Sequence, residues 1–167
     1  MNIAVRIEPA AAAPAEVDYR WDPDTDILTA SLRGMGSGEG MSGSVGVEGS
    51  DGSWIMFDVA RGRINGVEVA VWPEVRKRGS LQPPSSVEDA NVTVPSRASQ
   101  PGIASLEMDT SLMAEADPAE RNFHFAFGKP RPVRAVRIAR DILLDVDPRG
   151  RVAGLWLLNV PPFPADQ

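Results

Sequence analysis

Short runs in which apolar and polar residues alternate are the strongest pattern in this chain, and they predict β-strands. Apolar side chains occupy every second position of residues 123–127, and residues 27–32 alternate in the same way. Residues 54–59 are mostly apolar and rich in aromatic and β-branched side chains, which is typical of a buried strand, and residues 64–72 are its expected hairpin partner. Fifteen glycines and fifteen prolines interrupt the chain, and no segment carries a sustained helical stripe of apolar residues. We therefore expect a mainly β protein.

This pattern of strands and turns occurs twice. Asp22-Pro23 and the strand that follows reappear 95 residues later, beginning at Asp117-Pro118. The matches further along lie at offsets of 87 and 88 residues: Phe57-Asp58-Val59 with Leu144-Asp145-Val146, and Gly62-Arg63-Ile64 with Gly150-Arg151-Val152. Two tandem, degenerate copies of one unit explain these matches.

We expect residues 1–75 and 102–167 to form two pseudo-symmetric antiparallel β-meander repeats, packed as a sandwich or a barrel-like single unit. The linker between them would be residues 76–101, which are rich in proline, serine and glycine. Apolar strand positions of both copies should form the shared core: Ile55, Phe57, Val67 and Val69 against Phe125, Phe127, Leu144, Leu155 and Leu157. Strand exchange between the copies is left open.

Three segments are harder to assign. The linker leaves room for one short strand at residues 91–94. Residues 34–52 hold eight glycines and four serines, which indicates a mobile loop. Residues 133–140 have an arginine at every third position and fit a helix, but their counterpart near residues 44–48 is too glycine-rich for one, so a strand is favoured in both.

Charge and composition narrow the possible functions. The net charge of −6 disfavours binding of nucleic acid over a wide surface, because that affinity comes from lysine and arginine. The absence of cysteine excludes disulfides and a thiol nucleophile, and it fits a reducing compartment. The early apolar run at residues 10–13 lacks the features of an export signal, and no segment reaches the length of a membrane span. We expect a cytoplasmic protein without a membrane partner.

Four acidic residues of the first copy form a candidate cluster: Asp22, Asp26, Asp58 and Glu68. Grouped carboxylates bind hard metal ions or act as an acid and base pair. However, the second copy has Arg121 and Trp156 at the positions of Asp26 and Glu68. The favoured interpretation is structural, with Asp22 opening an Asp-Pro turn and Asp58 at a strand end, and no metal or other cofactor is expected.

Five cations form a candidate basic patch without an intervening acid: Lys129, Arg131, Arg134, Arg137 and Arg140. Such a run fits a nucleic-acid contact, but it also fits a basic edge strand that prevents aggregation. On a strand, Arg131 and Arg137 would face one way and Arg134 and Arg140 the other, so the cations would not form one stripe. The edge-strand interpretation is therefore favoured.

His124 is the only histidine, so it carries the only imidazole available for catalysis. It aligns with Thr29 of the first copy, on the face opposite Phe123, Phe125 and Phe127. We expect it to be a solvent-facing strand residue.

The first copy resembles the small uncharacterised bacterial family DUF2283. The resemblance rests on Trp21-Asp22-Pro23-Asp24-Thr25-Asp26-Ile27-Leu28 and on three later segments, Phe57-Asp58-Val59, Gly62-Arg63-Ile64 and Gly66-Val67-Glu68-Val69. It covers residues 17–73 and, more weakly, residues 111–161, where Ala116, Arg121 and Trp156 depart from the pattern. The resemblance implies a small β-rich module that works through association, and it implies no catalytic residue.

Three functions are compatible with these observations. We expect a non-enzymatic protein-interaction or binding module, with another protein or a second copy of the chain as its partner. The alternatives are nucleic-acid association through residues 129–140 and a carboxylate-dependent metal-binding hydrolase that uses the acidic cluster. The tandem arrangement further suggests a dimer fused into one polypeptide.

Overall fold

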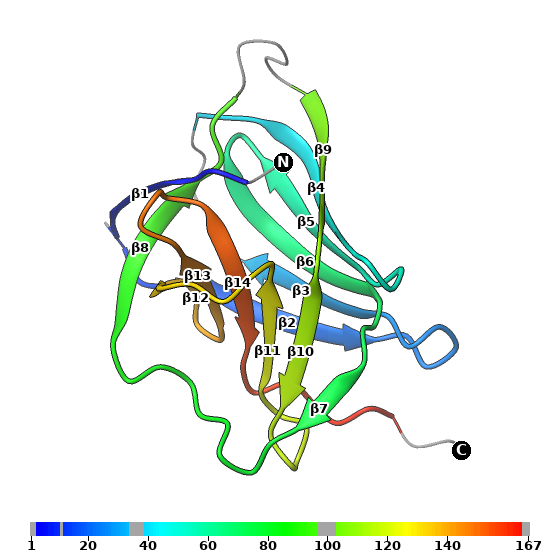
Figure 1. Cartoon of the computed structure of the whole chain (residues 1–167). Helices are drawn as coiled ribbons and strands as arrows, with labels where there is room; N and C mark the ends of the chain where they lie inside the picture. Colours follow the sequence, from blue (N-terminus) through cyan, green and yellow to red (C-terminus); the bar gives the residue numbers. More distant parts are fainter. Residues whose placement is uncertain (1–2, 11, 34–38, 97–102, 165–167) are drawn as a thin grey trace.

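Fourteen β-strands form the described part of the chain, which contains no helix (Figure 1). The structure is a computed structural model that describes residues 3–10, 12–33, 39–96 and 103–164, with the backbone alone at residues 103–107. The strands lie in two sheets packed face to face as a sandwich, as predicted.

The strand orders of the two sheets are given by their hydrogen-bonded neighbours. The eight-stranded sheet runs β1 (Arg6–Pro9), β8 (Val87–Thr93), β12 (Arg134–Ala139), β13 (Ile142–Val146), β14 (Val152–Leu157), β11 (Phe123–Phe127), β10 (Leu112–Ala116) and β7 (Val75–Lys77). The six-stranded sheet runs β2 (Glu16–Trp21), β3 (Leu28–Arg33), β6 (Arg63–Val71), β5 (Trp54–Ala60), β4 (Ser42–Gly49) and β9 (Ile103–Thr110).

Five antiparallel strands follow the same order in both sheets, β2-β3-β6-β5-β4 in one and β10-β11-β14-β13-β12 in the other. The predicted hairpin of β5 and β6 is confirmed. The meander prediction was wrong, because the third strand of each array lies at its far end and the fifth strand lies in the middle. Parallel pairs also make both sheets mixed, so they are not purely antiparallel.

The two arrays exchange strands. β9 pairs in parallel with β4 along its whole length, and after Ser111 the chain continues as β10 in the other sheet (Figure 1). A shorter parallel contact, between Ala15 and Ala139, places the segment before β2 beside β12. Each array is therefore extended by the segment that precedes the first strand of the other.

A single apolar core lies between the sheets. It contains all nine core residues predicted from the sequence: Ile55, Phe57, Val67, Val69, Phe125, Phe127, Leu144, Leu155 and Leu157. The alternation in β11 has the predicted result, since Phe123, Phe125 and Phe127 are buried and the residues between them are partly exposed. Each fully buried side chain of this size stabilises the fold by about 1.5–3 kcal/mol.

The glycine-rich segment contains a regular strand. Ser42–Gly49 form β4, so the prediction of a mobile loop over residues 34–52 was wrong for this part, and residues 34–38 lie outside the described residues. One reason for the glycines is steric, because a Cβ atom at Gly46 would overlap the ring of Trp54 on β5. Gly46 thus leaves room for the indole.

The connection between the arrays also carries structure. The predicted strand at residues 91–94 is found, but it begins earlier, as β8, and joins β1 and β12. Leu81, from the segment before β8, and Val87, its first residue, pack against Leu143, Trp156 and Leu158, outside the main core. The region is therefore largely part of the sandwich. Residues 97–101 lie outside the described residues.

Candidate functional site

The basic segment forms ion pairs along most of its length. Three of its arginines each contact a carboxylate: Arg134 with Glu88 at 3.4 Å, Arg137 with Asp89 at 3.2 Å and Arg140 with Glu16 at 3.5 Å. Two of these acids lie on β8, which pairs with β12 in parallel. β12 lies between β8 and β13, so the prediction of a basic edge strand was wrong, although the prediction of a strand at residues 133–140 is confirmed.

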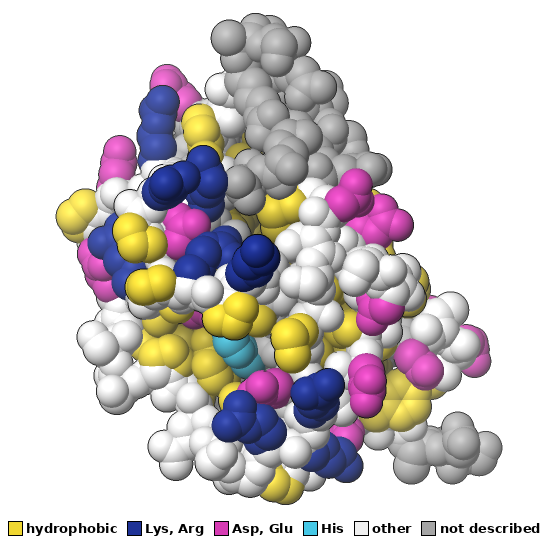
Figure 2. All heavy atoms as spheres, viewed as in Figure 1, with side chains coloured by type: hydrophobic (Ala, Val, Ile, Leu, Met, Phe, Trp, Pro, Cys, Tyr) yellow, Lys and Arg dark blue, Asp and Glu magenta, His cyan; other side chains and the backbone are white. Residues whose placement is uncertain are grey.

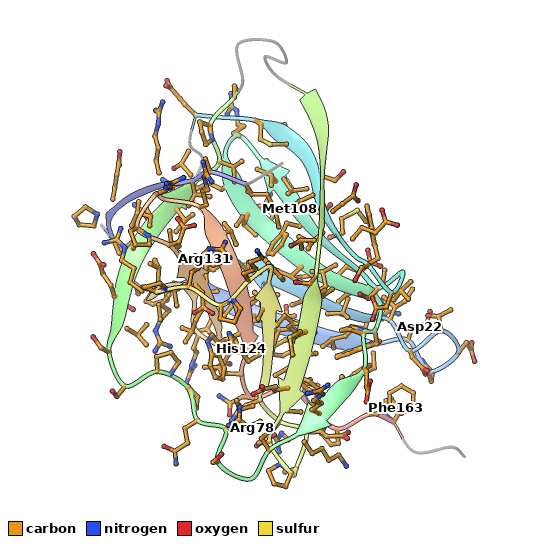
Figure 3. All side chains as sticks on the ribbon, in the orientation of Figure 1. Asp22, Arg78, Met108, His124, Arg131 and Phe163 are labelled. Carbon is orange, nitrogen blue, oxygen red and sulfur yellow. The ribbon has the colours of Figure 1, made fainter. Side chains whose placement is uncertain are left out.

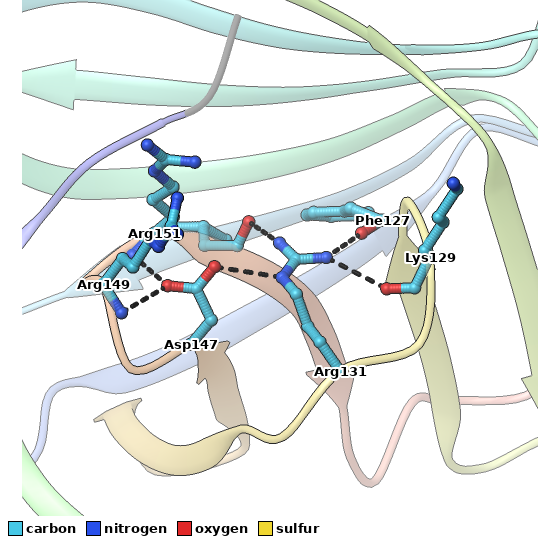
Figure 4. Close-up of polar contacts among 7 residues, drawn as sticks. Phe127, Lys129, Arg131, Asp147, Arg149 and Arg151 are labelled. Carbon is cyan, nitrogen blue, oxygen red and sulfur yellow. Dashed lines mark hydrogen bonds and ion pairs between the residues drawn. The ribbon is translucent and has the colours of Figure 1, made fainter.

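Arg131 holds two connections together (Figure 4). Its Nε donates to Asp147 Oδ2 at 3.0 Å, and its Nη1 donates to the carbonyl oxygen of Phe127 at 2.8 Å. The other oxygen of Asp147 accepts the backbone N–H groups of Arg149 and Arg151, both at 2.9 Å. The link between β11 and β12 is therefore fixed to the turn between β13 and β14.

Asp147 is charged at neutral pH in spite of its burial. Burial alone would raise the pKa of this carboxyl, but the N–H groups of Arg151 and Arg149 and the Arg131 guanidinium outweigh it and hold the pKa below its ordinary value. A buried carboxylate with this many donors is a rigid support for the turn around it.

A cationic hollow lies beside this support. We use that name for the depression around Lys129, Arg131, Arg149 and Arg151, whose apolar lining includes Met108 and Phe127. Asp147 is the one carboxylate among the described residues that line it. Among the described residues, Lys129, Arg149 and Arg151 have no ion-pair partner. Figure 2 shows Lys and Arg side chains gathered on this face of the molecule, above the histidine.

The hollow presents positive charge beside the apolar side chains of Met108 and Phe127. Lys129 and Arg149 are exposed, and Arg151 is partly exposed. Arg131 is turned inward by Asp147, so it contributes charge but has few N–H groups free for a ligand. The arrangement can hold an anionic group against the side chains of Lys129, Arg149 and Arg151.

The candidate acidic cluster is dispersed. Asp22 and Asp26 lie in the turn between β2 and β3, whereas Asp58 and Glu68 lie within β5 and β6. Asp22 has the predicted turn role: the backbone N–H of Asp24 donates to its Oδ1 at 3.0 Å, and this bond, followed by that of Thr25, lowers its pKa. In the part of the chain that the structure describes, no three His, Cys, Asp or Glu residues are grouped to hold a metal ion.

His124 has a partner that sequence reasoning missed. Its Nε2 lies 2.7 Å from Asp145 Oδ2, and its ring stacks on Trp156 with centroids 4.3 Å apart. Asp145 is buried on β13, opposite Gly154 of β14. The predicted outward face is correct, since the alternation of β11 puts His124 on the opposite side of the strand from the three buried phenylalanines. The sequence signal that could have pointed to Asp145 is an Asp and Gly pair that occurs in both copies, as Asp145 with Gly154 and as Asp58 with Gly66.

The chain matches no protein-family model and no curated protein. The resemblance to DUF2283 therefore stays a prediction. In the described residues, no helix has the length and apolar character needed to cross a membrane.

Proposed function

We propose that the protein is a non-enzymatic binding module that holds an acidic segment of a partner protein in the cationic hollow. The observation that carries this proposal is the presence of three cations, Lys129, Arg149 and Arg151, that no described carboxylate pairs with in a chain of net charge −6. Elsewhere in the basic segment, arginines are neutralised by acids. Unpaired cations held at one place favour a specific anionic ligand.

An acidic protein segment suits the hollow better than nucleic acid does. A nucleic-acid backbone needs a long track of cations, but Arg134, Arg137 and Arg140 are paired and the whole chain repels polyanions.

The proposal also includes two expectations from the sequence, the internal repeat and the cytoplasmic location. We infer that the two five-strand arrays are degenerate copies of one unit, equivalent to a dimer fused into one chain, which the shared strand order supports. A cytoplasmic location is likewise proposed, and the absence of cysteine supports it.

Charge reversal in the hollow tests the proposal. Fluorescence anisotropy would measure binding of a labelled glutamate-rich octapeptide to the full-length protein and to a Lys129→Glu, Arg149→Glu variant. We expect the variant to lose about tenfold in affinity or more, because two charge-assisted contacts are replaced by repulsion. An Arg20→Glu, Arg76→Glu variant, which changes the net charge equally at exposed positions outside the hollow, should bind nearly as the parent does.

Two outcomes would contradict the proposal. Equal losses of affinity in both variants would mean that binding depends only on the net charge of the protein. Tighter binding of a single-stranded oligonucleotide of the same charge, with the same dependence on Lys129 and Arg149, would favour the nucleic-acid alternative.

A further inference from the structure

An aromatic hollow lies beside the β2–β3 turn, away from the cationic hollow. Its walls are the rings of Trp21, Trp72, Phe123 and Phe163, and the carboxylates among its described lining residues are those of Asp26 and Glu120. These residues come from both five-strand arrays and from the C-terminal segment, so the hollow exists only where the two sheets meet. Figure 3 shows Phe163 and the turn of Asp22 toward the same side of the molecule.

The rings hold one another in place. Trp21 and Trp72 stack with centroids 5.5 Å apart and planes 18° apart. Phe163 meets Trp21 edge-on at 5.2 Å, and Phe123 contacts Trp72 at 5.3 Å. Trp72 also contacts the fully buried Phe125, which anchors the cluster to the core. The aromatic surface is therefore preorganised.

The indole N–H groups are already used. Trp21 Nε1 donates to the carbonyl oxygen of Pro161 at 2.8 Å, and Trp72 Nε1 donates to that of Asp26 at 2.7 Å. Neither ring can donate to a ligand without losing such a bond. A neutral sugar, which requires donors and acceptors around its hydroxyl groups, is poorly matched to walls that offer no free indole donor.

The polar groups that remain are carboxylates. Asp26 and Glu120 are both exposed and both have positive φ, 62° and 55°, at equivalent turns of the two arrays. Glu120 contacts Lys77 at 3.1 Å, in a pair whose side chains are more than half exposed. Asp26 has no ion-pair partner among the described residues. The hollow thus combines aromatic walls with an uncompensated negative charge.

We infer that the aromatic hollow binds an arginine side chain displayed by a partner protein. A guanidinium is flat and weakly hydrated, it is attracted to an indole ring, and its N–H groups can reach a carboxylate such as Asp26. The hollow is open, and its apolar lining includes Phe163, which is 42% exposed, and the partly buried Val75. A partner protein can cover these residues, whereas free arginine would leave most of the surface uncovered.

Indole resonances report this binding directly. The chain has four tryptophans, and each gives one indole signal in a proton–nitrogen NMR spectrum of the ¹⁵N-labelled full-length protein. On titration with acetyl-Gly-Arg-Gly-amide, the signals of Trp21 and Trp72 should shift saturably. The signals of Trp54 and Trp156, which lie outside the aromatic hollow, should not move.

Matched variants and a matched peptide make the test specific. Asp26→Asn keeps a residue that tolerates positive φ and removes the charge, and it should raise the Kd of the peptide about fivefold. Asp24→Asn removes a charge from the same turn outside the hollow and should change the Kd much less. The inference is overturned by unmoved Trp21 and Trp72 signals, by equal shifts with a citrulline peptide, or by equal losses in the two variants.

Discussion

A single glycine sets the geometry around the one histidine. Gly154 faces Asp145 across the β13–β14 pair, and the missing side chain leaves space for the carboxylate to reach His124. A Cβ atom at this position would lie 2.6 Å from Asp145 Oδ2 and 2.7 Å from the carbonyl oxygen of Phe125. The equivalent Gly66 is less crowded, with its nearest atom, the carbonyl oxygen of Ala30, at 3.3 Å.

Replacement of this glycine should be costly. We expect Gly154→Ala to lower the free energy of unfolding by about 1–3 kcal/mol, the usual cost of overpacking, because one of the atoms in the way is backbone. Gly66→Ala, at the matching place in the other sheet, should cost distinctly less. Urea unfolding followed by circular dichroism measures both. Equal stability of the two variants would contradict the close contacts at Gly154.

At the scale of elements, the turn between β13 and β14 depends on one carboxylate. Asp147 accepts two backbone N–H groups of its own turn and the guanidinium of Arg131 from the preceding connection. Its pKa is held below the ordinary value, so the folded state binds a proton at this group less readily than the unfolded chain does. The stabilisation is complete above the unfolded pKa, about 3.9, and is lost as the pH falls through the folded pKa.

The pH dependence of stability should show this contribution. Asp147→Asn should be less stable than the parent protein at pH 7, and the difference between their free energies of unfolding should shrink as the pH falls below about 4. Asp22 and Asp51, whose pKa values are also lowered, are present in both proteins and cancel in the difference. A constant difference from pH 7 to pH 3 would argue against a charged Asp147.

The sequence predicts individual strands better than it predicts their neighbours. Alternation and apolar runs identified β3, β5, β6 and β11 because they reflect which face of each strand is buried. The strand order depends on pairing between distant segments, which no local pattern encodes. The partners of the basic segment were missed for this reason, since Arg134 and Glu88 are 46 residues apart and meet only through the parallel β8–β12 pair.

The candidate sites could be predicted only in part for the same reason, because their residues come from distant segments. Lys129 and Arg131 were identified as part of a basic run, but Arg149 and Arg151 join them only because the turn after β13 folds back. Trp21 was noted in the resemblance and Asp26 as an acid, yet nothing in the sequence placed either beside Trp72 or Phe163. Residue type could be predicted, but proximity across the two sheets could not.

At the scale of the whole molecule, neither array is complete alone. Both sheets contribute side chains to one core cluster. The outer partner of β4 is β9, which lies in the second half of the chain. A fragment of residues 1–75 would expose the apolar face of β3, β5 and β6 and leave β4 unpaired on one side. Exposed faces and edges of this kind drive association.

We therefore expect the 1–75 fragment to be unfolded or self-associated when it is produced alone. Addition of the 76–167 fragment should restore the sandwich by supplying β9 and the facing sheet. Light scattering with size-exclusion chromatography and circular dichroism would measure mass and strand content. A monomeric 1–75 fragment that unfolds cooperatively would contradict both the shared core and the inferred fused dimer.

The continuity of β9 and β10 gives the sandwich a mechanical property. Successive residues of one extended segment are hydrogen-bonded first into the six-stranded sheet and then, past Ser111, into the eight-stranded sheet (Figure 1). Tension along this segment loads both sheets in shear at the same time. The hydrogen bonds of β9 in one sheet and of β10 in the other therefore resist the force together. The segment lies along one side of the sandwich, because β9 is the edge strand of its sheet and β10 lies one strand from the edge of the other, and the two layers should yield to force together.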